Sequence, residues 1–262
     1  MPLAQMDLNN KVILLTGASS GIGYSLAKLL PKENCSLALI SRRKNILDEL
    51  VAELKSGGLK ILSYKCDVGN IDDVRNTFEQ VKKDFGKIDI AILNAGASHR
   101  ADVKEYSAEI AKDIFDANTF GIVNCVEQLL PQFIQRKEGM IVGVSSLAEA
   151  RGFPKSGFYN ASKSAASILL ESLRIELKPY NVKVITVKPG FVRTQMTDKN
   201  EFHMPFLMDV DKAANIIIDG IKKEKPIIQF PLPTVIGSKI VKFMPDWLFD
   251  FLMSLPLPPR KN

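Results

Sequence analysis

Two side chains with complementary proton chemistry are four residues apart in the segment GFYNASKSAAS, residues 157–167. Tyr159 carries a phenol and Lys163 an ammonium, and residues at this spacing lie on one face of a helix. A phenol can act as a general acid or base, but its ordinary pKa of about 10 is too high for an efficient base at neutral pH. A nearby positive charge favours the phenolate and so lowers that pKa. The pair therefore fits proton transfer, although a surface Tyr–Lys pair on an ordinary helix has the same spacing.

A glycine-rich loop, TGASSGIG at residues 16–23, follows the first apolar run of the chain directly. Its glycines at 17, 21 and 23 allow a sharp turn and a close approach of a ligand to the backbone. The helix that begins there presents unpaired N–H groups and the positive end of its dipole to a phosphate. A strand, this loop and a helix in succession are the context in which the motif indicates a dinucleotide site. The spacing is GxxxGxG rather than GxGxxG.

The elements that must position these residues alternate regularly along the chain. Short, continuously apolar strands separated by amphipathic helices indicate a parallel sheet covered on both faces. The sequence predicts a single-domain α/β fold, a doubly wound parallel sheet of the Rossmann type. The expected strands are 11–16, 36–41, 60–66, 89–94, 140–146 and 182–189, and the expected helices are about 21–32, 44–55, 71–85, 107–136 and 157–178.

The composition changes after about residue 226. We expect a catalytic domain over 1–225, with a substrate lid near 192–209, and a proline-rich amphipathic C-terminal extension over 226–262. The extension is expected to form a short strand and two short helices broken at Pro245. It fits a flap packed on the core or on a second subunit. It fits equally a lipophilic substrate lid or a membrane-surface anchor, with Lys239, Lys242, Arg260 and Lys261 facing lipid headgroups.

The bulk properties narrow the classes of partner. A net charge of +6 suits a phosphate-bearing ligand, an anionic membrane or simply a lysine-rich surface in water. The absence of a dense basic run with interleaved aromatic residues argues against nucleic-acid binding. Cys35, Cys66 and Cys125 are odd in number and lack CxxC spacing, which predicts reduced, buried thiols in a cytoplasmic compartment. With two histidines in the chain, we expect no metal site, and no signal peptide or membrane span is expected.

Seven segments together give the sequence a family resemblance. They are TGASSGIG, CDV at 66–68, NAG at 94–96, Asn118, VSS at 144–146, YNASK at 159–163 and PGFVRT at 189–194. In these segments and in their order, the sequence is similar to the short-chain dehydrogenase/reductases of the compact, single-domain form. The resemblance spans residue 11 to about residue 225 and implies an enzyme that interconverts a carbonyl and an alcohol with a nicotinamide cofactor.

The resemblance also implies catalytic roles. Tyr159 is the acid/base, and Lys163 favours its phenolate and bonds the nicotinamide ribose. Ser146, thirteen residues before Tyr159, polarises the substrate carbonyl, with Ser145 as the less favoured candidate. Asn118 holds a water in the proton relay.

The second expected strand ends in SRRK, residues 41–44, where an acidic residue would select NAD. No acid is present, and a guanidinium can bind a phosphate in a forked geometry, so Arg42 with Ser41 predicts NADP(H). Arg43 either assists or is solvated. The resemblance implies that Asp67 and Val68 flank the adenine and that Thr194 contacts the carboxamide. The complete predicted cofactor set is Gly17, Ser19, Ser20, Gly21, Ile22, Gly23, Ser41, Arg42, Asp67, Val68, Asn94, Ala95, Gly96, Tyr159, Lys163, Pro189, Gly190, Val192 and Thr194.

The segment EFHMPFLM, residues 201–208, places apolar and pliable side chains in the expected lid. Such side chains suit a lipophilic carbonyl or alcohol, for example a fatty aldehyde, a 3-oxo lipid, a steroid or a retinoid. This favours a carbonyl reductase of lipid metabolism, and the family resemblance implies a homodimer or homotetramer. The alternative function is a non-catalytic NADP(H)-binding regulatory protein or a membrane-surface scaffold.

Overall fold

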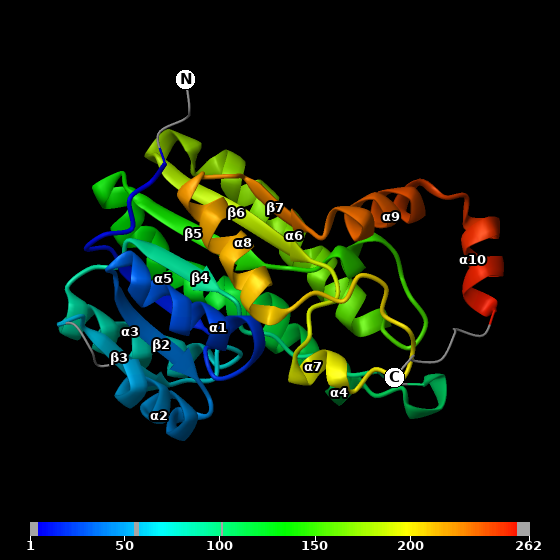
Figure 1. Ribbon diagram of the computed structural model, residues 1–262, viewed down its shortest axis with the longest axis horizontal. Coiled ribbons are helices and arrows are strands. Elements are labelled where there is room, and N and C mark those ends of the chain that lie inside the picture. The colour runs from blue at the N-terminus through cyan, green and yellow to red at the C-terminus, as the bar shows by residue number, and fades with distance from the viewer. Residues whose placement is uncertain (1–4, 55–57, 101, 256–262) are drawn as a thin grey trace.

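A parallel β-sheet runs through the middle of the molecule, with helices on both faces (Figure 1). The computed structural model describes residues 5–54, 58–100 and 102–255. Within these residues the sheet has seven strands, in the order β3-β2-β1-β4-β5-β6-β7. The strands are β1 Val12–Thr16, β2 Ser36–Ser41, β3 Ile61–Lys65, β4 Ile90–Leu93, β5 Gly139–Val144, β6 Val182–Pro189 and β7 Ile227–Phe230. The α-helices are α1 Gly21–Leu29, α2 Lys44–Leu54, α3 Ile71–Phe85, α4 Ala108–Phe115, α5 Gly121–Arg136, α6 Gly157–Glu176, α7 Gln195–Asp198, α8 Val210–Lys222, α9 Leu232–Phe243 and α10 Asp246–Ser254.

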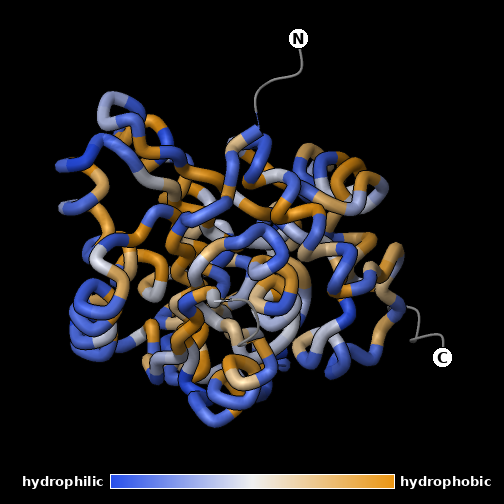
Figure 2. The backbone as a smooth tube through the Cα atoms, turned by 60° about the vertical axis from the view of Figure 1, so that its left-hand side comes forward, coloured by the Kyte–Doolittle hydropathy of each residue, from blue (hydrophilic) through white to orange (hydrophobic). Residues whose placement is uncertain are grey.

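The apolar strands supply a core to each face of the sheet. Successive side chains of a strand point to opposite faces, so Ile13 and Leu15 of β1 join one cluster while Leu14 joins the other. The first cluster is closed by α1, α2 and α8, and the second by α3, α5 and α6. Figure 2 shows hydrophobic residues along the inner strands and hydrophilic ones on the outer helical turns. The predicted doubly wound α/β fold is confirmed.

The centre of the sheet sets the position of the site. β1 pairs with β2 on one side and with β4 on the other, so the chain winds outward in both directions from this point. In open parallel sheets the crevice for a ligand lies at the carboxyl ends of the strands, where the strand order reverses. The loops after β1, β4, β5 and β6 therefore meet at one edge.

The long helix expected over 107–136 is interrupted. A single π-helical turn, Asp116–Phe120, lies between α4 and α5. Turns of this kind are rare and are found frequently at functional sites. Periodicity could not predict it, because α4 and α5 each keep the amphipathic period of an α-helix.

The chain from residue 226 to residue 255 forms the expected strand and two helices. Arg260 and Lys261, which were expected to face lipid headgroups, lie outside the described residues. β7 pairs with β6, so this part of the chain completes the sheet. In Figure 1, α9 and α10 (orange and red) extend beyond the end of the sheet. Arg151 ties their junction to the segment before α6, donating to the Met244 carbonyl at 2.9 Å and to Asp246 Oδ1 at 2.8 Å.

Three further properties concern the described residues. Cys35, Cys66 and Cys125 are free and buried, as expected. No helix among the described residues is both long enough and apolar enough to span a bilayer. In the same ranges, no three His, Cys, Asp or Glu side chains gather closely enough to bind a metal ion.

Candidate active site

The glycine loop forms a tight cradle between β1 and α1. Gly17 and Gly21 have φ angles of +68° and +54°, a region that side chains other than glycine adopt rarely. A Cβ on Gly17 would lie 2.7 Å from Ala95 Cα, and one on Gly23 would lie 2.3 Å from the Gly17 carbonyl oxygen. The Asn94 side chain holds the loop from the end of β4, donating to the carbonyls of Thr16 and Gly17 at 3.2 and 3.3 Å. The backbone is thus shaped for a ligand to approach closely.

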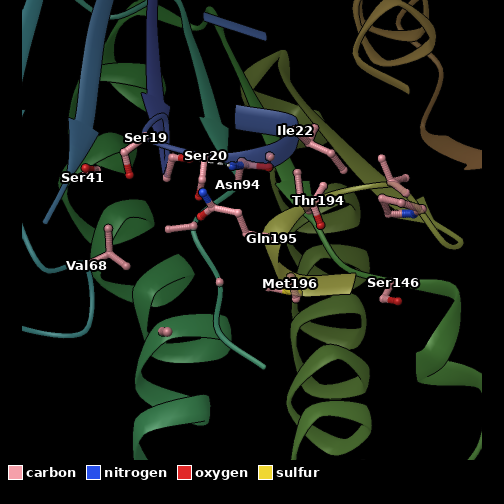
Figure 3. A pocket seen from close by; sticks show the side chains of 18 of the residues that line it. Ser19, Ser20, Ile22, Ser41, Val68, Asn94, Ser146, Thr194, Gln195 and Met196 are labelled. Atoms are coloured by element: carbon pink, nitrogen blue, oxygen red, sulfur yellow. Dashed lines mark hydrogen bonds between the residues drawn. The ribbon is translucent and has the colours of Figure 1, made fainter. Parts of the chain in front are cut away.

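A cavity of about 310 Å³ extends from this loop along the carboxyl edge of the sheet. Figure 3 shows Ser41 and Val68 toward one end and Ser146 and Met196 toward the other. Every predicted cofactor residue except Gly23 lines it, as do Ser146, Tyr159 and Lys163. Six lining residues besides Arg43 and Ser145 were not predicted, although most adjoin a predicted motif: Cys66, Ala117, Val144, Gln195, Met196 and Thr197. No residue of the segment 201–208 lines the cavity.

Gly23 and Asn118 lie just behind the cavity wall. Gly23 packs directly under Gly17, so its role is to keep α1 close to β1. Asn118 is fully buried in the π-helical turn. Its Oδ1 accepts a hydrogen bond from the Ala97 amide at 2.8 Å, and its Nδ2 donates to the Ala97 carbonyl at 2.9 Å and to Ser162 Oγ at 3.0 Å. Asn118 therefore joins the loop after β4 to α6.

Tyr159, Lys163 and Ser146 meet at one end of the cavity. The first two lie on α6, as the spacing predicts, with Lys163 Nζ 5.9 Å from the centroid of the Tyr159 ring. Lys163 is 4% exposed and donates a hydrogen bond to the Val144 carbonyl at 2.8 Å. Ser146 caps the short helix Leu147–Ala150, and its Oγ accepts from the Ala148 amide at 3.1 Å. The end of β5 thus brings the serine to the tyrosine.

Burial shifts the two titratable groups in opposite directions. Desolvation raises the pKa of Tyr159, and a hydrogen bond with the Ser146 side chain only partly opposes it. This is the reverse of the lowering that we expected from Lys163. Burial lowers the pKa of Lys163 from 10.5 to about 8, while the Glu149 carboxylate counters that effect. Lys163 is itself desolvated and bonded to the Val144 carbonyl. In the protein alone it therefore does not offset the rise that burial causes in the pKa of Tyr159.

Both arginines after β2 lie at the far end of the cavity, but they bind different groups. Arg43 reaches over the glycine loop, donating from Nε to Ser19 Oγ at 3.1 Å and from Nη2 to Ser20 Oγ at 2.7 Å. Arg42 forms an ion pair with Asp67, Nη1 to Oδ2 at 3.6 Å, and its side chain is 72% exposed. The sequence left the role of Arg43 open, and in the structure its guanidinium bonds directly to the glycine-rich loop.

The segment after β6 closes the other side of the cavity. Thr194 caps the short helix α7 in a reciprocal arrangement with Thr197, whose Oγ1 accepts from the Thr194 amide at 2.9 Å. The base of the expected lid is tied by two backbone bonds, Arg193 N to Met208 O and Met208 N to Phe191 O, both 2.9 Å. Within the lid Phe202 packs edge-on against Phe191. Residues 201–208 are thus joined to the segment after β6 and do not line the cavity.

Comparison with known proteins agrees with this geometry. The family model for short chain dehydrogenases matches residues 11–204. An uncharacterized oxidoreductase of Myxococcus xanthus (strain DK1622) is 33% identical over 244 residues, which cover 93% of this chain and 96% of the relative. A short chain dehydrogenase/reductase from Burkholderia phymatum in complex with NAD has a TM-score of 0.83 at 23% identity, covering 90% of this chain and 94% of that one. A short-chain dehydrogenase from Sphingobium yanoikuyae in complex with NADPH has a TM-score of 0.80 at 26% identity, covering 93% and 95%. The chain belongs to the short-chain dehydrogenase family and is an oxidoreductase.

Proposed function

We propose that the protein is an NADP(H)-dependent oxidoreductase that interconverts a carbonyl and an alcohol on a lipophilic substrate. The observation that carries this proposal is the meeting of Ser146, Tyr159 and Lys163 at one end of a cavity whose other end is a glycine-rich phosphate loop. A dinucleotide fits the residues present. The cradle leaves no room for a Cβ on Gly17, and Arg42, Arg43 and Lys163 supply positive charge along the cavity.

When bound, the nicotinamide supplies or accepts the hydride. The chain's own residues manage the proton. Ser146 donates a hydrogen bond to the substrate oxygen, and Tyr159 gives that oxygen its proton in the reductive direction. A raised pKa suits Tyr159 as the proton donor, because the phenol stays protonated at neutral pH. Lys163 stabilises the phenolate that forms, and Asn118 fixes the loop that faces α6.

Arginine at the end of β2 favours NADP(H) over NAD(H). Arg42 is exposed, and its ion pair with Asp67 is long, at 3.6 Å, which supports its availability for a ribose 2′-phosphate. Arg43 already bonds both serines of the loop, so its main effect is on the loop itself. We expect Arg42→Ala to weaken NADPH binding at least tenfold and to leave NADH binding nearly unchanged. Arg43→Ala should weaken both cofactors, which fluorescence titration would measure. Equal affinities of the intact protein for NADPH and NADH would contradict this assignment.

A lipophilic substrate is supported by the side chains around Ser146. Val144, Val192 and Met196 line the cavity, with Met196 toward the Ser146 end in Figure 3, and Phe191 after β6 packs against Phe202. Apolar walls with few polar groups are typical of sites that orient a hydrophobic molecule by one reacting oxygen.

The experiment that tests the function is NADPH oxidation against aldehydes and ketones of rising chain length, with small polar sugars alongside. We expect turnover that rises with chain length and falls at least a thousandfold in Tyr159→Phe, while the variant still binds NADPH. Tight NADPH binding without turnover in either direction on any carbonyl or alcohol would favour the alternative, a non-catalytic NADP(H)-binding regulatory or scaffold protein. Faster turnover of sugars would contradict the lipophilic class.

Two exposed apolar surfaces support further assignments. On α6, Ile168 and Ile175 are 69% and 68% exposed and seven residues apart, which suits a homodimer or homotetramer contact. On α9 and α10, Phe243 and Trp247 are 82% and 72% exposed near Lys242, which suits peripheral contact with an anionic membrane. The free, buried thiols are consistent with a reducing, cytoplasmic compartment.

A further inference from the structure

Glu149 lies in a short helical turn, and both its side chain and its backbone contact residues next to the candidate active site. It lies in the short helix Leu147–Ala150, three residues after Ser146, and its side chain is 15% exposed. One carboxylate oxygen, Oε2, accepts hydrogen bonds from Ser145 Oγ at 2.8 Å and from Ser167 Oγ. The other, Oε1, binds Lys188 Nζ of β6. The carboxylate is therefore held from three sides, by Ser145 after β5, Ser167 of α6 and Lys188 of β6.

These contacts converge on the turn of α6 that carries Lys163. Ser145 Oγ lies 2.9 Å from the Lys163 carbonyl oxygen and also within bonding distance of the carboxylate. Ser167 is one helical turn further along α6. The Glu149 backbone carbonyl accepts a bond from Ser164 Oγ at 2.8 Å. Side chain and backbone of Glu149 thus bond directly to Ser167 and Ser164 of this helix, on either side of the turn that follows Lys163.

The charge of Glu149 also acts on Lys163. The ammonium is nearly buried, and among the described residues it forms no ion pair, since its hydrogen bond goes to the neutral Val144 carbonyl. Desolvation lowers the pKa of Lys163, and the Glu149 carboxylate is the charge that raises it again. Lys188 neutralises part of the negative charge of that carboxylate, so Glu149 and Lys188 have opposite effects on the pKa of Lys163.

The other charged groups on the elements packed around Glu149 do not replace it. Arg151 follows the helix Leu147–Ala150 but is paired with Asp246. Lys239 and Lys242 of α9, the helix that contacts this turn, are exposed. On α6, Glu171 pairs with Arg174 near the surface, and Tyr159 faces the cavity.

We propose that Glu149 is a positioning residue: it fixes the turn of α6 that carries Lys163 and keeps the Lys163 ammonium charged, and Lys188 sets the strength of this effect. The inference rests on the proposed function, in which a charged Lys163 stabilises the Tyr159 phenolate.

The test is the pH profile of kcat/KM for NADPH-dependent reduction in two single variants. In Glu149→Gln the alkaline limb should move to lower pH by about half a unit or more, because the carboxylate is lost and Lys188 is left unpaired. In Lys188→Met the limb should move to higher pH, because the carboxylate is no longer neutralised. If the Glu149–Lys188 pair were merely structural, both variants would lose activity but their alkaline limbs would not move in opposite directions. Limbs that move in the same direction, or do not move, would therefore overturn the inference.

A matched control breaks a similar ion pair at the other end of the strands. Glu33 and Lys222 are 2.8 Å apart, with side chains 30% and 25% exposed. Glu33→Gln should leave the alkaline limb in place. The double variant Glu149→Gln, Lys188→Met removes both charges, so its limb should return to within about 0.3 units of the wild-type position. A double variant that stays shifted as far as Glu149→Gln would contradict the electrostatic account.

A second readout needs no cofactor or substrate. The folded pKa of Lys163, about 8, lies below its unfolded value of 10.5, so its discharge adds stability as pH rises through this window. Urea unfolding measures the pH at which this gain in the free energy of unfolding begins. That pH should be lower in Glu149→Gln and higher in Lys188→Met than in the wild type. Both movements should vanish in a Lys163→Met background. If the stability onsets move as expected but no turnover is found, the proposed function alone is refuted. If turnover is found but neither the alkaline limbs of kcat/KM nor the stability onsets move, this inference alone is refuted.

Discussion

Replacing the buried Lys163 by methionine is expected to abolish activity and to stabilise the fold at neutral pH. Its pKa is lowered from 10.5 to about 8, so holding the charged form in the folded protein costs about 3 kcal/mol at pH 7. Methionine is similar in length and apolar, so it removes that cost without a large cavity. It also removes the hydrogen bond to the Val144 carbonyl, which costs about 1–2 kcal/mol. The free energy of unfolding of Lys163→Met should therefore exceed that of the wild type by about 1–2 kcal/mol at pH 7.

The sign of the pH dependence separates this cause from others. The folded-state pKa lies below the unfolded one, so the charge cost is complete below pH 8 and disappears as pH approaches 10.5. Near pH 10 the wild-type lysine is neutral and keeps its hydrogen bond, so the variant should lose its advantage there.

Urea unfolding followed by circular dichroism at pH 7 and pH 10, at one protein concentration, measures both values. Lys83→Met, on the exposed side of α3, is the control, and its effect should be small and equal at the two pH values. A Lys163→Met protein less stable than wild type at pH 7, or equally stabilised at both pH values, would refute the reasoning.

Four other substitutions test separate parts of the molecule. Ser146→Ala should lower kcat by about 10²-fold or more with NADPH affinity unchanged, as steady-state kinetics and fluorescence titration would show. Gly23→Ala places a Cβ 2.3 Å from the Gly17 carbonyl oxygen, so NADPH affinity should fall at least tenfold. Ile168→Glu should convert an oligomer to a monomer in light scattering, and a monomeric wild type would exclude this contact. Trp247→Ser should reduce flotation with anionic vesicles but not with neutral ones, and unchanged flotation would remove α10 from the membrane assignment.

The strands could be predicted closely because a buried parallel strand is apolar without interruption. β2 and β6 have the predicted bounds, 36–41 and 182–189. The pairing of Tyr159 with Lys163 was predictable for a related reason, since helical spacing alone places them on one face. Family motifs led to the lining residues, whose individual roles remain predictions.

Contacts between distant segments could not be predicted. Glu149 and Lys188 are 39 residues apart and meet only because β5 pairs with β6. Two adjacent arginines, Arg42 and Arg43, have the same charge in the sequence, and only the backbone direction after β2 decides which one reaches Ser20. The first part of the expected lid, Val192 and residues 194–197, lines the cavity, whereas Phe202 packs against Phe191, a contact that the sequence could not predict.

The π-helical turn at Asp116–Phe120 accommodates one residue more than a regular helix of the same rise would hold. Ile114 before it and Ile122 after it are both buried, and Ile122 joins the core cluster that α3, α5 and α6 close. Deleting one residue within the turn would restore a regular helix of the same rise, so α4 and α5 would keep their relative register. The bulged backbone that carries Asn118, and with it the inward direction of that side chain, would be lost. The irregular turn thus lets α4 and α5 keep the packing register of one helix while Asn118 between them faces the site.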